Sequence, residues 1–155
     1  MASGLEALGT AAAFLELAKA GIELAKVISQ FVEARSRIKS LIQEIELVSA
    51  VLGLLSSVFE QEAKDQVCSA EALEAANNIG TAFRTVLDKL RPAVNRHLTG
   101  RTGPDGSNTI SVRAIMTWPV REVKISTLLA SLERIKSNAN LMLQVITLAR
   151  LSRPT

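Results

Sequence analysis

The chain has 155 residues, of which 48% are hydrophobic, 21% charged and only 3% aromatic, and its formal net charge is +3. This length fits one domain, which we place over residues 1–155, and the apolar fraction excludes intrinsic disorder. The single cysteine, Cys68, cannot form an internal disulfide, which points to a reducing compartment. Cys68 and the single histidine, His97, are too few for a zinc site, which needs three or four ligands.

The excess of basic residues lies in the last third of the chain. Residues 101–155 contain eight Lys and Arg against three Asp and Glu, whereas residues 1–34 contain two against four. We expect no binding to nucleic acid, because the basic residues are dispersed and no aromatic residues alternate with them. An anionic membrane surface fits at least as well, at about 1 kcal/mol per basic residue. The alternative is a solvated face with a slight surplus of charge.

The sequence predicts neither a secretory signal nor a transmembrane helix. Its first residues lack the basic region and cleavage site of a signal peptide. Charge-free stretches such as Leu47–Phe59 are shorter than the roughly 18–20 residues that a bilayer needs. We therefore expect a soluble chain at rest.

Residues 4–34 are predicted to form the first helix. A polar stripe follows one face of it at spacings of three and four, through Glu16, Lys19, Glu23, Lys26, Gln30 and Glu33. Continued towards the N-terminus, this stripe would fall on Ala12, Leu8 and Leu5, so the first turns are apolar on nearly every side. Either this beginning is buried within a bundle, or it is a concealed segment that can leave the bundle and insert into a membrane or partner.

Residues 36–60 and 70–91 are predicted to form the second and third helices. The second has two adjacent apolar rows, so we expect its C-terminal half to be central. These rows are Ile38, Leu41, Ile45, Val48, Leu52, Leu55 and Phe59, and Leu47, Val51, Leu54 and Val58. The third has a seam of coiled-coil type at Leu73, Ala76, Gly80, Phe83, Leu87 and Leu90. Ser69 is its expected N-cap, and Pro92 ends or kinks it, with room for an extra turn through Val94–Leu98.

The fourth helix is predicted over residues 119–150, after a loop at 99–110 that is rich in turn residues. It starts at Trp118-Pro119, because proline is favourable at the first helical position. Its apolar row is Ile125, Leu128, Leu132, Ile135, Ala139, Met142, Ile146 and Ala149. Helices and loops of these lengths predict an all-α antiparallel four-helix bundle with a long first and fourth helix and room for one short extra helix.

We expect no enzymatic activity, no cofactor and no metal. Catalysis needs a nucleophile next to a base, paired carboxylates or a metal. His97 has no evident partner, and the carboxylates lie mostly on helix surfaces near Lys or Arg.

Three segments of the chain match a known pattern. They are Gly-Leu-x-x-Leu-Gly-x-Ala-Ala-Ala near the N-terminus, Leu-Ile-Gln-Glu-Ile-Glu-Leu-Val-Ser-Ala-Val-Leu in the second helix, and Trp118-Pro119 followed by Leu128-Leu129-x-x-Leu132-Glu133-Arg134-Ile135-Lys136. Over roughly residues 4–150 the pattern resembles the fungal HeLo-like domains, which lie at the N-terminus of fungal NOD-like (STAND) receptors and related cell-death proteins. These domains are similar to the four-helix bundle of the mixed-lineage kinase-like executioner of necroptosis.

The resemblance implies an inducible cell-death effector that oligomerises and permeabilises membranes through its N-terminal helix. The residues that it assigns to membrane insertion are Leu5, Leu8, Ala12, Phe14 and Leu15, and Trp118 and Pro119 would anchor the fourth helix. The basic residues that we expect to contact anionic lipid are Arg101, Arg113, Arg121 and Lys124.

The partners implied are anionic phospholipids, further copies of the chain, and a receptor or amyloid-type activator. The chain would be cytoplasmic at rest and move to the plasma membrane on activation. The alternative is a homotypic adaptor or sensor bundle without membrane activity, in which the apolar beginning is a docking surface for another helix.

Overall fold

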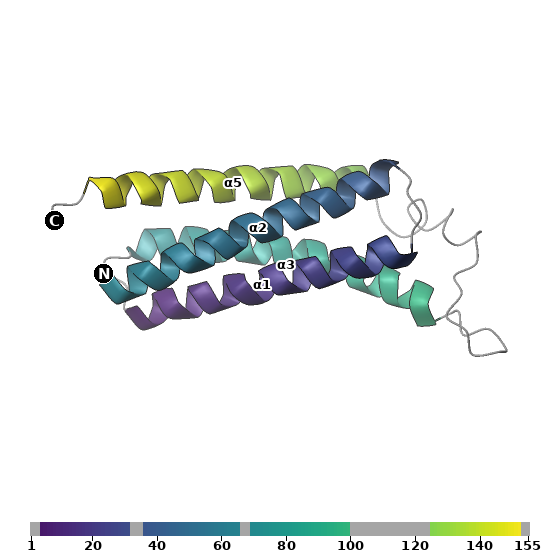
Figure 1. Ribbon diagram of the computed structural model, residues 1–155, viewed down its shortest axis with the longest axis horizontal. Coiled ribbons are helices and arrows are strands. Elements are labelled where there is room, and N and C mark those ends of the chain that lie inside the picture. Colours follow the sequence, from purple (N-terminus) through teal and green to yellow (C-terminus); the bar gives the residue numbers. More distant parts are fainter. Residues whose placement is uncertain (1–3, 32–35, 66–68, 100–124, 153–155) are drawn as a thin grey trace.

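The computed structural model describes residues 4–31, 36–65, 69–99 and 125–152, and they form four long helices (Figure 1). These are α1 (Gly4–Phe31), α2 (Ser36–Asp65), α3 (Ala70–Thr99) and α5 (Ile125–Leu151). No strand occurs in these ranges. The predicted all-α four-helix bundle is therefore confirmed.

The first three helices begin where the sequence predicts, but α2 and α3 run further. α2 continues past residue 60 to Asp65, because Glu62 and Ala63 are buried and give its last turn a packing surface. α3 passes through Pro92 and includes the extra turn that follows it. Pro92 cannot donate to the carbonyl four residues earlier, at Asp88, but both residues lie on the exposed side of the helix, where water can reach that carbonyl.

Several predicted features lie outside the described residues. They are the loop over 100–110, the start of the last helix at residues 119–124, and the ends of the first helix and of the chain. The extra short helix is likewise untested.

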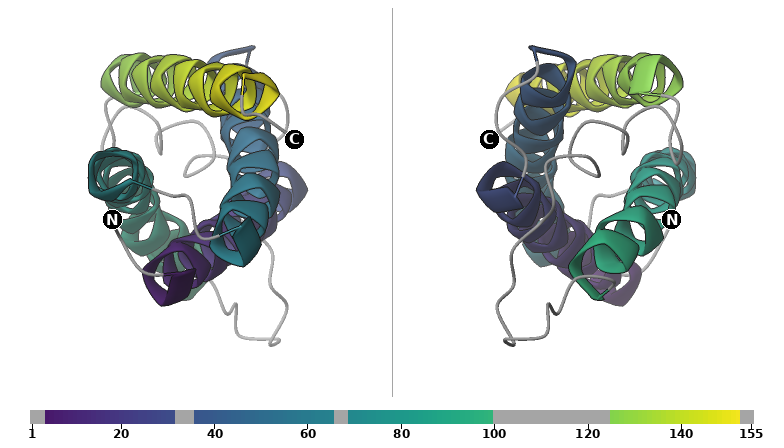
Figure 2. Two further views of the ribbon diagram at one scale, coloured as in Figure 1. Left: turned by 90° about the vertical axis from the view of Figure 1, so that its left-hand side faces the viewer. Right: turned by 90° about the vertical axis from the view of Figure 1, so that its right-hand side faces the viewer.

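Each helix runs antiparallel to the one before it (Figure 1). Seen end-on, however, the order around the bundle is α1, α2, α5, α3, so that α2 lies diagonally opposite α3 (Figure 2). Two of the four packed pairs, α2 with α5 and α1 with α3, are consequently parallel. Because α2 and α5 are parallel neighbours, charged residues near both ends of α2 form ion pairs with residues of α5.

The core is aliphatic and centres on α2. The first of its two predicted rows is fully buried, at Ile38, Leu41, Ile45, Val48, Leu52, Leu55 and Phe59, and so is the seam of α3. The second row is only partly buried, since Val51 and Val58 pack against the core but Leu47 and Leu54 are about half exposed. α2 has packed neighbours on two sides only, and its remaining surface faces outward.

Gly21 lets three helices meet closely. A Cβ at this position would overlap the Oγ of Ser49 on α2 and would lie 3.0 Å from Cζ of Phe83 on α3. A Cβ at Gly80, on the seam of α3, would make ordinary contacts, the nearest at 3.4 Å to Cδ1 of Leu17. The close approach therefore depends on α1 rather than on α3.

Candidate functional site

The most distinctive surface of the described helices is an exposed row of aliphatic side chains on α1. We define the α1 stripe as Leu5, Leu8, Ala12, Leu15 and Ile22. Spacings of three, four, three and seven residues keep these side chains on one face of the helix. Leu5 is 79% exposed, and the other large members are between 36% and 46% exposed.

α1 is apolar on two sides. The α1 stripe covers its exposed side, and a second apolar side forms part of the core. The core side contains small residues, among them Ala7, Ala11 and Ala18, which let α2 pack close. The Oγ of Ser56 on α2 donates a 2.7 Å hydrogen bond to the carbonyl of Ala11. The sequence left two interpretations of the first turns of α1, a buried start or a concealed segment. Neither is complete, because one side of these turns is buried and the other side is exposed to solvent.

Phe14 does not lie on the α1 stripe. It is only 1% exposed, and its ring lies 5.8 Å from that of Phe59 in the core. Of the five residues predicted to insert into a membrane, four therefore share an exposed surface in this fold. Phe14 could reach a membrane only if α1 left the bundle.

Two lysines continue the same helical row towards the end of α1. Lys19 and Lys26 follow Leu15 and Ile22 at spacings of four, and both are exposed. The exposed face therefore changes along its length from aliphatic to mixed charge, because exposed Glu16 and Glu23 lie beside these lysines. A helix of this kind can lie in the interface of an anionic membrane, with its apolar side chains in the lipid and its lysines at the headgroups.

The predicted lipid-contacting residues Arg101, Arg113, Arg121 and Lys124 lie outside the described residues, as do Trp118 and Pro119. Their roles stay predictions. Within the described ranges, no three His, Cys, Asp or Glu side chains come together in a way that could hold a metal ion.

Sequence reasoning missed a groove between α3 and α5. Its volume is about 810 Å³. We define the α3–α5 groove by Ala75, Ile79 and Ala82 of α3 and Leu141, Met142 and Val145 of α5. Leu141 and Val145 are 60% and 56% exposed, so the wall contributed by α5 is open to solvent. Their spacing of four, continued by exposed Leu148, was the available signal for this surface.

Two sets of charged residues tie α5 to α2. In the first, Nζ of Lys136 lies 3.1 Å from Oε2 of Glu44 and 2.9 Å from Oε2 of Glu133. The hydrogen bonds that Lys136 donates to Glu133 and Glu44 raise the pKa of Lys136 above its ordinary value of 10.5. Because the charged form is favoured in the folded state, this lysine stabilises the fold below its unfolded pKa.

We expect part of that stability to disappear in strong alkali. It is fully present below about pH 10.4, the pKa of an unfolded lysine, and is lost as the pH rises through the higher pKa of folded Lys136. Urea unfolding at pH 9 and pH 11 should show a smaller alkaline loss for Lys136→Met than for the unaltered chain. An equal loss in both proteins would contradict this, since all other lysines are the same in the two.

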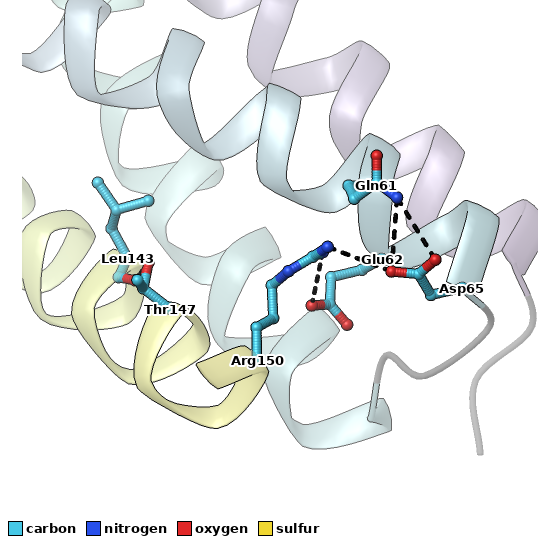
Figure 3. A network of polar contacts seen from close by, with 6 residues as sticks. All are labelled: Gln61, Glu62, Asp65, Leu143, Thr147 and Arg150. Atoms are coloured by element: carbon cyan, nitrogen blue, oxygen red, sulfur yellow. Dashed lines mark hydrogen bonds and ion pairs between the residues drawn. The ribbon is translucent and has the colours of Figure 1, made fainter. Parts of the chain in front are cut away.

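The second set lies near the ends of α2 and α5 (Figure 3). Nη1 of Arg150 lies 3.3 Å from Oε1 of Glu62, and its Nη2 lies 3.3 Å from Oδ2 of Asp65. Gln61 donates to Asp65 at 3.4 Å. Only 3% of the Glu62 side chain is exposed, whereas Arg150 reaches solvent. The carboxylate of Glu62 therefore lies inside the bundle, and Arg150 of α5 balances its negative charge.

One of the described helices is long and apolar enough in composition to cross a membrane, over Ile38–Asp65 of α2. This match rests on length and composition alone. The same composition also suits the central helix of this bundle, where Leu41, Leu52 and Leu55 are buried.

Comparisons with protein-family models, with curated proteins and with solved structures found no match for this chain.

Proposed function

We propose that this chain is a cell-death effector bundle that binds anionic membranes through the α1 stripe, oligomerises and permeabilises the bilayer. The observation that carries the proposal is the exposure of Leu5, Leu8 and Leu15 on one face of the first helix. The resemblance in sequence pattern to HeLo-like domains supports the same conclusion. We place the chain in the cytoplasm at rest and at the plasma membrane after a receptor or amyloid-type partner activates it, with no role for nucleic acid.

The first step is adsorption to the membrane surface. Complete burial of a Leu or Ile side chain contributes about 1.5–3 kcal/mol, and the half-exposed members of the stripe contribute part of this. Lys19 and Lys26 add about 1 kcal/mol each near anionic headgroups, and repulsion of the neighbouring exposed Glu16 and Glu23 offsets part of this gain. Together, the burial of the stripe in lipid and the attraction of the lysines to the headgroups support reversible adsorption of the folded bundle.

Permeabilisation requires a second step, in which α1 gives up its core contacts. Phe14, Leu17 and Ile28 are buried and would have to find new apolar surroundings in lipid or between copies of the helix. Glu16 and Glu23 also lie on α1 and are costly in a bilayer unless they are paired or neutralised. This cost explains why the effector would stay inactive until a trigger and further copies stabilise the inserted form.

The test is dye release from anionic vesicles. The double substitution Leu8→Glu/Leu15→Glu should lower release roughly tenfold or more, since each carboxylate at membrane depth costs a few kcal/mol. Leu54→Glu is the matched control, because Leu54 is 55% exposed on α2 and outside the stripe. It should leave release unchanged.

Circular dichroism has to show that all three proteins remain helical. Equal release by the double variant and the unaltered protein would contradict the proposal. Binding should also weaken with added salt if the lysines contact lipid.

A second function is favoured by the regular spacing of the stripe. Positions 5, 8, 12, 15, 19, 22 and 26 alternate between spacings of three and four, which is the repeat of a coiled-coil seam. An adaptor that binds other helical bundles would use the same face. It would associate equally well with and without vesicles and would never release dye.

A further inference from the structure

The bundle has two open apolar surfaces, the α1 stripe and the α3–α5 groove. We propose that the α1 stripe of one copy docks into the α3–α5 groove of a second copy, so that the chain assembles head to tail. This deepens the self-association in the proposed function, and it rests on that part of the proposal. The occupant of the groove is thus a second copy of the same chain.

The two surfaces cannot meet within one molecule. α1 already packs against α2 and α3, and it lies diagonally opposite α5 (Figure 2). Leu17 and Ala20 of α1 are turned to α3, where they lie near Arg84. The stripe is on the exposed side of α1, away from these contacts, so only a second molecule can bring it to the groove.

The stripe and the groove have matching lengths. From Leu5 to Ile22 the stripe advances 17 residues along its helix, and from Glu71 to Lys89, at the two ends of the groove, α3 advances 18. At 1.5 Å per residue, the two lengths are about 26 Å and 27 Å. The α3 wall carries small residues, Ala75 and Ala82 among them, between which the leucines of a third helix can pack.

The charge at one end of the groove is complementary to a charge near the end of α1. Glu71 lies at the end where α3 begins, and Lys89 and Arg134 line the groove further along. A docked α1 that runs antiparallel to α3 brings Lys26 towards Glu71.

A contact between two different surfaces leaves one free stripe and one free groove on every pair. Such heterologous contacts continue into rings or open filaments. The assembly also competes with membrane binding for the same α1 surface, except at the copy whose stripe stays free.

Two variants of the full chain and their mixture test the proposal. Leu15→Glu places a charge in the α1 stripe, and Val145→Glu places a charge in the α3–α5 groove. Both positions are about half exposed, so circular dichroism should show that both variants stay folded. In size-exclusion chromatography with light scattering, we expect the unaltered chain to associate as its concentration rises. Each variant alone should be monomeric, with its dissociation constant raised roughly tenfold or more. An equimolar mixture should give a 1:1 dimer, because each variant retains the surface that the other lacks.

Three outcomes would overturn the inference. Association of Val145→Glu alone would show that stripes pair with stripes. Association of both variants would show that another surface is used. A monomeric mixture would show that the groove does not receive α1, as when residues 100–124 of the same chain fill it. Dye release by the unaltered chain is measured separately, so loss of the membrane function and loss of the head-to-tail contact are distinguishable.

Discussion

Arg150→Met is expected to lower the free energy of unfolding by about 2–3 kcal/mol. The substitution removes one ion-pair partner of Glu62, whose side chain is only 3% exposed, and leaves the Glu62 charge inside the bundle. Breaking a fully buried pair in this way typically costs about 3–5 kcal/mol. We expect less here, because Arg150 is itself 32% exposed and solvent screens the pair. Urea denaturation at neutral pH measures the change.

Arg91→Met is the matched control for this substitution. Arg91 pairs with Asp88 at 3.7 Å, and both side chains are about half exposed or more. Exposed pairs contribute between about 0 and 1 kcal/mol, so this variant should be nearly as stable as the unaltered chain. The double variant Glu62→Gln/Arg150→Met should recover most of the loss, since no charge stays buried. Equal stability of the two arginine variants would show that Glu62 does not depend on Arg150.

Gly21→Ala is expected to destabilise the bundle by about 1–3 kcal/mol, which is the usual cost of overpacking a core. The added methyl group would collide with Oγ of Ser49 and press on Phe83. Helix propensity alone predicts the opposite sign, because alanine is better than glycine in a helix by about 1 kcal/mol. Thermal or urea unfolding decides which effect dominates.

Gly9→Ala provides the control on the same helix. Nothing lies within 4 Å of a Cβ at Gly9, so this substitution should raise the stability by up to about 1 kcal/mol. Ser49 offers a rescue, since its buried Oγ has no hydrogen-bond partner among the described residues. Ser49→Ala combined with Gly21→Ala should be less destabilised than Gly21→Ala alone. A stabilising Gly21→Ala would mean that α1 and α2 can separate without cost.

The local pattern of residues in the sequence was enough to predict most of the helical structure. The beginnings of α1, α2 and α3 were predicted at the observed residues. Ser69 caps α3 as expected, since its Oγ accepts a 3.1 Å hydrogen bond from the backbone N–H of Ala72. The polar stripe of α1 is exposed at Glu16, Lys19, Glu23 and Lys26. These features depend on residues within a few turns of one another.

The candidate site was only partly predictable. The sequence singled out Leu5, Leu8, Ala12 and Leu15, but it grouped them with Phe14, which the fold buries against Phe59. An apolar residue looks the same in sequence whether its face meets another helix or solvent. The α3–α5 groove was missed for the same reason, since Leu141 and Val145 read as ordinary members of an apolar helix.

The sequence by itself determined most of the helical residues, where the first three helices begin and which rows are apolar, because helical periodicity and caps are local properties of the chain. Only the tertiary structure decided the order of the helices around the bundle. The parallel packing of α2 and α5 joins Lys136 to Glu44 and Arg150 to Glu62, residues 92 and 88 positions apart. Such pairings follow from the sum of many small packing differences over the whole bundle, and no short segment of the chain contains that information.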